Sequence, residues 1–226
     1  MTQLDWLHKL LSQGFHRMGQ LEIMSAPGSG FWLCHEDDRD AVVQSHGQPA
    51  GFQITDDPYQ AREISTYSAD NEYRFTKGQT NLRGGWLMKL ADAAALLAAL
   101  DGFYPACFGL WVAQQRGSLD VQNLRDKLNR QTGMYRFARS ISDEGAQELV
   151  QKVCGPAHQC AKKILWQLDA NTPLADSEAS RFNGVSSGLP EPQAIPLLCR
   201  EACNHFVAEC RKVSKREFEA KAAASS

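Results

Sequence analysis

The sequence has no long apolar run and no excess of charge of either sign. Its longest uninterrupted apolar run covers residues 93–100, far short of the roughly 20 residues that cross a bilayer. The 24 basic and 26 acidic side chains give a net charge of −2, which provides no basic surface for nucleic acid. The N-terminus also lacks a basic segment followed by a cleavable apolar stretch. We therefore expect a soluble, cytoplasmic protein that binds neither nucleic acid nor a membrane.

Cysteine, in contrast, is plentiful. Seven cysteines occur in 226 residues, a length at which a hydrophobic core forms without disulfide bridges. In a reducing compartment, a set of this size indicates metal binding or redox chemistry more often than disulfides. A metal centre would therefore serve a function or stabilise one local region of the fold.

The first 78 residues have the pattern of a small α+β domain. Apolar residues at helical spacing predict a helix over 5–11, which stops near Gly14, and a second helix is expected over 58–65. Alternation of apolar and polar residues between turn-forming segments predicts strands. These strands cover 21–24, 30–35, 51–54 and 72–75.

Residues 79–226 predict a second, mainly α-helical domain. The expected helices cover 85–102, 118–133 and 142–154, and a last helix starts at 196 and runs past 213. Serine N-caps, a proline in the first turn and glycines at the C-terminal ends mark their limits. The connection 171–195 has no periodicity, and a connection of this length inside a compact domain is usually functional or mobile. The fold class is therefore α+β.

Four of the cysteines form two close pairs on either side of that connection. Cys154 pairs with Cys160, and Cys199 pairs with Cys203. Two ligand pairs on separate elements are the usual plan of a four-thiolate metal site. On the predicted last helix, Cys199 and Cys203 would be four positions apart and share one face. Cys199 would then lie in the first turn, where the helix dipole favours a thiolate.

The spacing within each pair favours an iron–sulfur cluster over zinc. Around one zinc ion the sulfur atoms crowd within roughly 4 Å of one another, because each lies about 2.3 Å from the metal, and zinc sites favour tight C-x₂₋₄-C knuckles. A cubane [4Fe-4S] cluster presents its irons at separate corners, so its cysteine sulfurs stand further apart. The looser spacing of both pairs suits that cluster better.

Spacing alone leaves two other interpretations open. In one, zinc holds the four thiols together in an interaction protein and adds only folding stability. In the other, the protein is a metal-free helical scaffold, because Cys199, Cys203 and Cys210 fall on one helical stripe and free cysteine is among the most buried residue types. Cys34 and Cys107 lie in apolar surroundings and are predicted to be packing residues.

Four segments carry a resemblance to a known family: "TNLRGGWLMKLADAAALLAALDGFYP", "NRQTGMYR", "CGPAHQCAKKILW" and "PLLCREACNHFVAE". In this order they resemble the [4Fe-4S]-binding domain found at the C-terminal side of certain sirohydrochlorin cobaltochelatase-like (CbiX-type) proteins and in free-standing relatives. The likeness covers roughly residues 80–213. The preceding region, mainly through "FWLCHEDD" and the later hairpin, resembles the small stabilising domain that accompanies the cluster domain.

The resemblance implies one [4Fe-4S] cluster, with Cys154, Cys160, Cys199 and Cys203 as its ligands. It implies electron transfer or support of a partner enzyme, which we expect to be a redox or chelatase-type protein of tetrapyrrole metabolism. The sequence contains no chelatase domain, so the chain is not expected to be an enzyme on its own. Such a cluster with its four thiolates carries a charge of −2. The candidates to balance that charge are Lys162, Lys163, Arg200 and Arg211.

Overall fold

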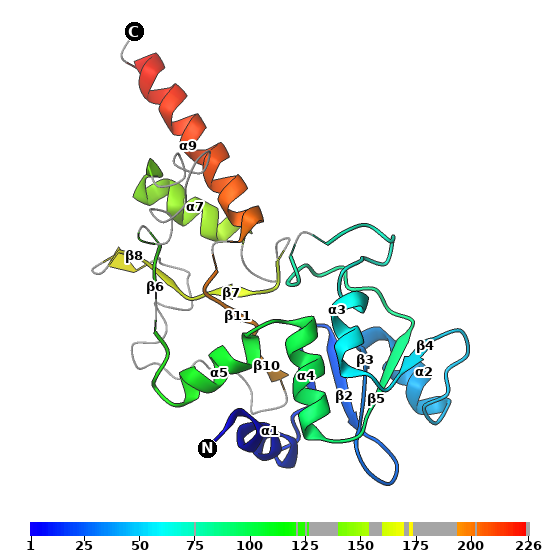
Figure 1. Ribbon diagram of the computed structural model, residues 1–226. Coiled ribbons are helices and arrows are strands. Elements are labelled where there is room, and N and C mark those ends of the chain that lie inside the picture. Colours follow the sequence, from blue (N-terminus) through cyan, green and yellow to red (C-terminus); the bar gives the residue numbers. More distant parts are fainter. Residues whose placement is uncertain are drawn as a thin grey trace. The chain divides into compact units, whose positions relative to one another are not determined.

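The protein divides into two compact units. A computed structural model describes residues 1–74, 76–120, 122–124, 126, 140–153, 160–169, 172–173, 194–201 and 203–224 (Figure 1). The first unit consists of residues 1–118 together with 190–197, and the second consists of residues 119–189 and 198–226. The chain therefore enters the second unit, returns to the first for a short segment, and ends in the second.

The first unit is built on a six-stranded mixed sheet. Its strand order is β10-β1-β2-β3-β5-β4. The neighbours from β1 to β5 pair antiparallel, whereas β10 pairs parallel with β1 and β4 pairs parallel with β5. The strands are β1 (Arg17–Met18), β2 (Leu21–Ser25), β3 (Phe31–His35), β4 (Gln53–Thr55), β5 (Trp86–Leu90) and β10 (Ala194–Ile195).

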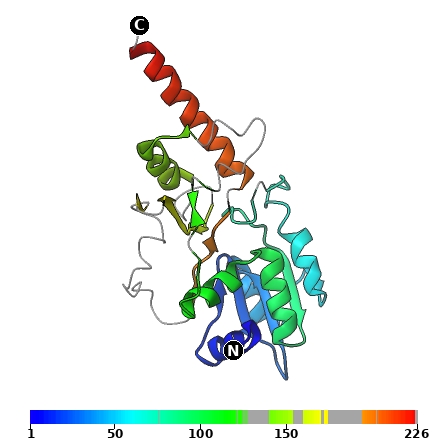
Figure 2. The same cartoon turned by 60° about the vertical axis from the view of Figure 1, so that its left-hand side comes forward.

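The first unit also contains helices, some of which contact the sheet. They are α1 (Gln3–Ser12), η1 (Glu36–Asp38), α2 (Arg39–Gln44), η2 (Pro58–Gln60), α3 (Ala61–Ile64), α4 (Ala93–Phe103) and α5 (Cys107–Gln115). Figure 2 shows α4 lying across the sheet, and α4 contacts both β3 and β5. The fully buried rings of Trp86 on β5 and Phe103 on α4 stack with their centroids 4.7 Å apart. This stacking joins the helix layer to the sheet.

In the described part of the chain, no helix is by itself long and apolar enough to cross a membrane. Helices α4 and α5 together meet the length and composition of a span, but they are bent by 110° with respect to each other.

The second unit is organised around two helices, α7 (Asp143–Val153) and α9 (Asn204–Ala224). The two helices pack side by side (Figure 1). Short strands accompany them: β6 (Gln122–Asn123), β7 (Lys163–Ile164), β8 (Trp166–Asp169), β9 (Thr172–Pro173) and β11 (Leu198–Cys199). The buried core consists of Leu124, Ile141, Ala146, Leu149, Val153, Phe206, Val207, Cys210 and Val213.

The two helices approach each other closely at Gly145. A Cβ atom at this position would lie 2.9 Å from Cγ1 of Val213 and would also overlap the carboxylate of Glu217. That carboxylate accepts hydrogen bonds from the backbone N–H of Ser142 at 3.0 Å and from the Ser142 hydroxyl at 2.6 Å. The Ser142 hydroxyl in turn accepts a hydrogen bond from Gly145 N–H at 3.0 Å. A side chain of α9 thus holds the residue that caps α7, and its negative charge lies at the positive end of the helix dipole.

The predicted α+β class is confirmed, but several predicted boundaries differ from the structure. The units divide near residue 118 and not after residue 78. The predicted helix over 85–102 is a strand followed by a helix. Strand β5 lies between β3 and β4 in the sheet. Helix α4 follows it, and Asp92 caps this helix by accepting a hydrogen bond from Ala95 N–H at 2.8 Å. A strand between two neighbours has a nearly continuous apolar sequence, which on its own also suits a helix.

Two predicted helix boundaries in the second unit also differ from the structure. The predicted helix over 118–133 is not formed at its start, where β6 is a strand, and residues 127–133 lie outside the described part of the chain. The last helix begins at Asn204 instead of Pro196, because the residues before it pair as β11 with β7. Proline in a first turn is only a preference, and here strand pairing overrides it.

The turn between β2 and β3 provides a test of the first unit. Gly28 (φ +90°) and Gly30 (φ +86°) both have left-handed backbone conformations. A Cβ on Gly28 would meet no atom within 4 Å, whereas a Cβ on Gly30 would overlap the carbonyl oxygen of Leu90. We expect Gly28→Ala to lower the free energy of unfolding by about 1 kcal/mol, the cost of the backbone conformation alone. Gly30→Ala should cost clearly more, about 2 kcal/mol or above.

Urea denaturation followed by tryptophan fluorescence would measure both variants. Gly28→Ala is the matched control, because it shares the backbone cost without the overlap. Equal losses of stability in the two variants would contradict the close approach of this turn to β5.

Candidate metal centre

A short parallel ladder brings two of the predicted ligand segments together. Strand β7 pairs with β11 so that Ile164 stands opposite Cys199, and Leu165 N–H donates a 2.7 Å hydrogen bond to the carbonyl of Cys199. Cys160 lies four residues before Ile164 on the first of these segments, and only 7% of its surface is exposed. Residues separated by the long connection 171–195 are therefore neighbours in space.

Cys203 occupies the N-cap position of α9. Its sulfur accepts a hydrogen bond from Phe206 N–H at 3.4 Å, and its carbonyl accepts one from Val207 N–H at 2.9 Å. These two bonds are the pattern of an N-cap residue. The positive end of the helix dipole thus acts on Cys203 and not, as predicted, on Cys199. The expected pairing of both cysteines on one helical face is wrong, because Cys199 belongs to a strand.

Cys199 has its own hydrogen-bond donor. The backbone N–H of Glu201 lies 3.4 Å from its sulfur. Burial raises the pKa of the Cys199 thiol to about 11, while the Glu201 N–H and the charge of Lys162 act in the opposite direction and a thiolate at Cys160 adds to the rise. The thiol therefore stays protonated at neutral pH unless a positive centre, such as a metal, stabilises its thiolate.

The fourth predicted ligand, Cys154, lies outside the described residues. It follows Val153, the last residue of α7, whose side chain is buried in the core shared with α9. Within the described ranges, no group of three or more His, Cys, Asp or Glu side chains has the arrangement that holds a single metal ion.

The described donors fit an iron–sulfur cluster in their chemistry. Thiolates are the protein ligands of such clusters, and N–H groups directed at the sulfur atoms stabilise the reduced state. Cys160, Cys199 and Cys203 are free thiols, and Cys199 and Cys203 each accept a backbone N–H bond. These residues would hold the cluster, which supplies one-electron chemistry when bound.

The other described cysteines pack in the two cores. Cys34 and Cys107 are fully buried in the first unit, as predicted, and Cys210 is fully buried in the core of the second. Burial raises the pKa of Cys34 to about 12, and it also raises the pKa of Cys210. These thiols are inert packing residues, since reactive cysteines have lowered pKa values and access to solvent.

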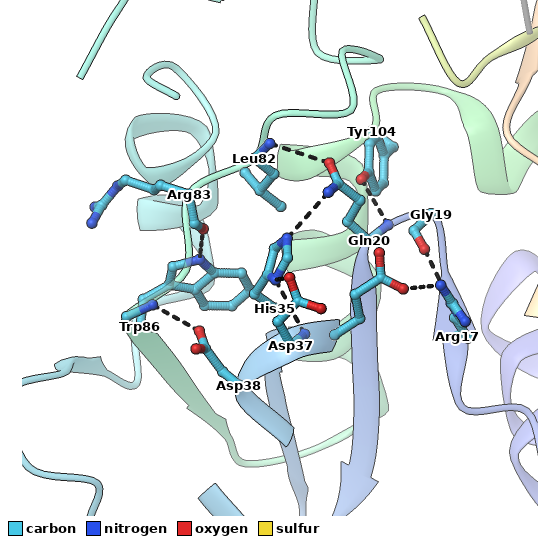
Figure 3. Close-up of polar contacts among 12 residues, drawn as sticks. Arg17, Gly19, Gln20, His35, Asp37, Asp38, Leu82, Arg83, Trp86 and Tyr104 are labelled. Carbon is cyan, nitrogen blue, oxygen red and sulfur yellow. Dashed lines mark hydrogen bonds and ion pairs between the residues drawn. The ribbon is translucent and has the colours of Figure 1, made fainter. Parts of the chain in front are cut away.

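A partly buried polar network of the first unit has a structural role (Figure 3). Gln20 is its centre: its backbone N–H donates to the Tyr104 hydroxyl at 3.1 Å, its side-chain oxygen accepts from Leu82 N–H at 3.2 Å, and its amide nitrogen lies 3.2 Å from Nε2 of His35. Asp38 accepts a 2.7 Å bond from Gly85 N–H. The network fastens the segment before β5 to strands β2 and β3.

His35 is buried within this network. Burial lowers the pKa of its imidazole, against the opposing effect of Asp37 and Asp38. The ring is therefore neutral at physiological pH. In the sequence, this network could be found only through the polar residues that follow "FWLC", which are equally typical of a surface turn.

Comparisons with known proteins agree with the two units. Residues 116–212 match the family described as a 4Fe-4S iron-sulfur cluster binding domain. Residues 3–115 match the family described as the DR2241 stabilising domain. The fold and the cysteine segments thus define an iron–sulfur protein with an accessory stabilising unit. Since this second match spans half of the chain, the protein belongs to the DR2241 stabilising domain family, and its cofactor is a [4Fe-4S] cluster.

One solved structure shows the same fold. DR2241 from Deinococcus radiodurans is 21% identical, with a TM-score of 0.69 over 94% of the present chain. It is described as a multi-domain protein with structural similarity to chelatases and with two additional novel domains. The present chain spans 41% of that protein. No curated protein matches the sequence.

The difference in burial and pKa among the cysteines predicts an order of chemical reactivity. In cluster-free protein, iodoacetamide should modify Cys199 and Cys203, which are partly exposed, before Cys34 and Cys210. The rate at Cys199 should keep rising between about pH 8 and about pH 10, because its raised pKa of about 11 leaves most of the thiol protonated throughout that range. For an ordinary thiol, with a pKa of about 8.5, the modification rate would level off within this pH range.

Peptide mapping by mass spectrometry would give the rate at each site. Cys34, buried in the first unit, is the internal control. Modification of Cys34 as fast as that of Cys203 would contradict the described burial.

Proposed function

We propose that this chain holds its [4Fe-4S] cluster through Cys154, Cys160, Cys199 and Cys203 and uses it to pass electrons to a partner protein. The observation that carries the proposal is the β7–β11 ladder, which sets Cys199 beside the segment of Cys160. Cys203 follows within the same stretch, at the N-cap of α9. All four cysteines fall inside the matched range 116–212.

The positions of the described ligands suit a cluster better than a single ion. Cys199 lies on a strand, Cys203 caps a helix, and Cys160 lies on a separate segment, so three kinds of local backbone present the sulfur atoms. A zinc site requires four sulfurs about 2.3 Å from one ion, usually from tight knuckles. A cubane accepts more widely separated ligands, one at each iron.

Electron transfer is favoured by the exposure of two of these ligands. Cys199 and Cys203 are partly exposed, whereas Cys160 is buried. A cluster bound there would lie near the surface, where a partner can approach it closely. The N–H groups of Glu201 and Phe206 directed at the sulfurs would raise its reduction potential.

For the partner, we propose a redox protein or a chelatase-type protein, and for the setting a reducing cytoplasm. The described similarity of the Deinococcus protein to chelatases supports the first part. The six described cysteines are all free thiols, which supports the second. On its own the chain would act as an electron carrier or support protein and not as the enzyme.

Purification without oxygen, followed by iron and sulfide analysis, tests the ligand set. We expect a brown protein with about four irons and four sulfides per chain. Cys154→Ser, Cys160→Ser, Cys199→Ser and Cys203→Ser should each lose most of the cluster, because each removes a thiolate. Cys210→Ala is the matched control: it removes a buried cysteine of the same unit and should keep the cluster, at a cost of about 1 kcal/mol in stability.

Stoichiometric zinc without sulfide in the wild-type protein would refute the proposal. Full cluster content in any of the four serine variants would remove that residue from the ligand set.

A redox titration followed by electron paramagnetic resonance tests the electron-transfer role. The oxidised cluster should give no signal and the dithionite-reduced cluster a signal of one unpaired electron, with reversible reoxidation. A cluster that is stable but neither reducible nor oxidisable would contradict electron transfer and leave a structural role.

A further inference from the structure

Buried cations are rare in the described part of the chain. Among the lysines and arginines whose side-chain burial the structure describes, a set that leaves out Lys152 and Lys163, only Arg74 and Lys162 are buried, with 3% and 7% of their surfaces exposed. Arg74 belongs to the first unit, where its guanidinium donates to the carbonyl of Ser65 at 2.8 Å. Lys162 belongs to the second unit and follows Cys160 by two residues.

Lys162 lies beside the ligand segments. It directly precedes β7, whose Ile164 pairs with Cys199 in the ladder with β11. The positive charge of Lys162 acts on the Cys199 thiol and lowers its pKa, against the larger effect of burial.

The chemistry of the cofactor gives this charge a role. A [4Fe-4S] core with four thiolates carries −2 when oxidised and −3 when reduced. Buried charges are retained where an opposite charge pairs with them. A fixed cation beside the thiolates stabilises the reduced state more than the oxidised state, because the reduced state carries one more negative charge.

We propose that the Lys162 ammonium is the internal counter-charge of the cluster and holds its reduction potential up. This inference rests on the proposed function, since it requires a cluster on Cys160 and Cys199. Of the four cations suggested by the sequence, Arg200 and Arg211 are only partly buried, so solvent screens their charges more strongly. Lys162 acts on the potential through space and is not a ligand.

Three substitutions separate charge from structure. Lys162→Met removes the charge and keeps an apolar side chain of similar length, whereas Lys162→Arg keeps the charge. Lys215→Met makes the same chemical change on α9, where the lysine side chain is 77% exposed. Each full-length holoprotein is first assayed for iron and sulfide, and its midpoint potential is then measured by redox titration with electron paramagnetic resonance.

In Lys162→Met we expect at least a tenfold loss in the ratio of reduced to oxidised cluster at a fixed potential, which is a shift of about 59 mV to more negative values for one electron. Lys162→Arg and Lys215→Met should stay within a third of that shift. A fully loaded Lys162→Met protein with an unchanged potential would overturn the inference and leave the proposed function standing. Absence of iron and sulfide from the wild-type protein would instead refute the proposed function.

The stability of the bound cluster provides a second measurement, which can be used when a variant assembles poorly or when the cluster cannot be reduced. The rate of iron loss to a ferrous chelator should rise at least severalfold in Lys162→Met and not in Lys162→Arg. Loss of the cluster from Lys162→Met but not from Lys162→Arg would likewise support the need for a cation. Equal loss from both variants would overturn the inference, because the defect would then follow from side-chain shape and not from charge.

Discussion

The pairing of β7 with β11 is the interaction on which the account of the metal centre depends. Only two residues on each strand take part, yet this ladder sets Cys199 beside the chain that carries Cys160 and Lys162. It also ends the strand four residues before Cys203, so that Cys203 caps α9.

The rest of the second unit supports this ladder. Helix α9 starts immediately after Cys203 and is anchored along α7 by a buried apolar core. Gly145 allows the two helices to approach closely, and Glu217 of α9 caps α7 through Ser142. Within the second unit, the ligand segment is therefore held by strand β11 at Cys199 and by helix α9 after Cys203.

The sequence was informative where a chemical requirement is local. The α+β class could be predicted from the alternation of apolar and polar residues, and the [4Fe-4S] cofactor from the cysteine pairs and the resemblance of four segments. The start of the last helix could not, because Pro196 is a good first-turn residue and the competing strand depends on a partner 35 residues earlier. The unit boundary was misplaced for a similar reason: β5 follows a change of composition, but it pairs with β3 of the first unit. Lys162 was one of four candidate cations, and only burial in the folded chain separates it from Arg200 and Arg211.

Native mass spectrometry of protein purified without oxygen tests the central claim most directly, because it weighs the chain together with what it holds. The account predicts a single dominant species. Its mass should equal that of the bare chain plus four irons and four sulfides, minus the protons that the four cysteine thiols lose on binding. The bare chain, or the chain with one zinc ion, as the dominant species would contradict it.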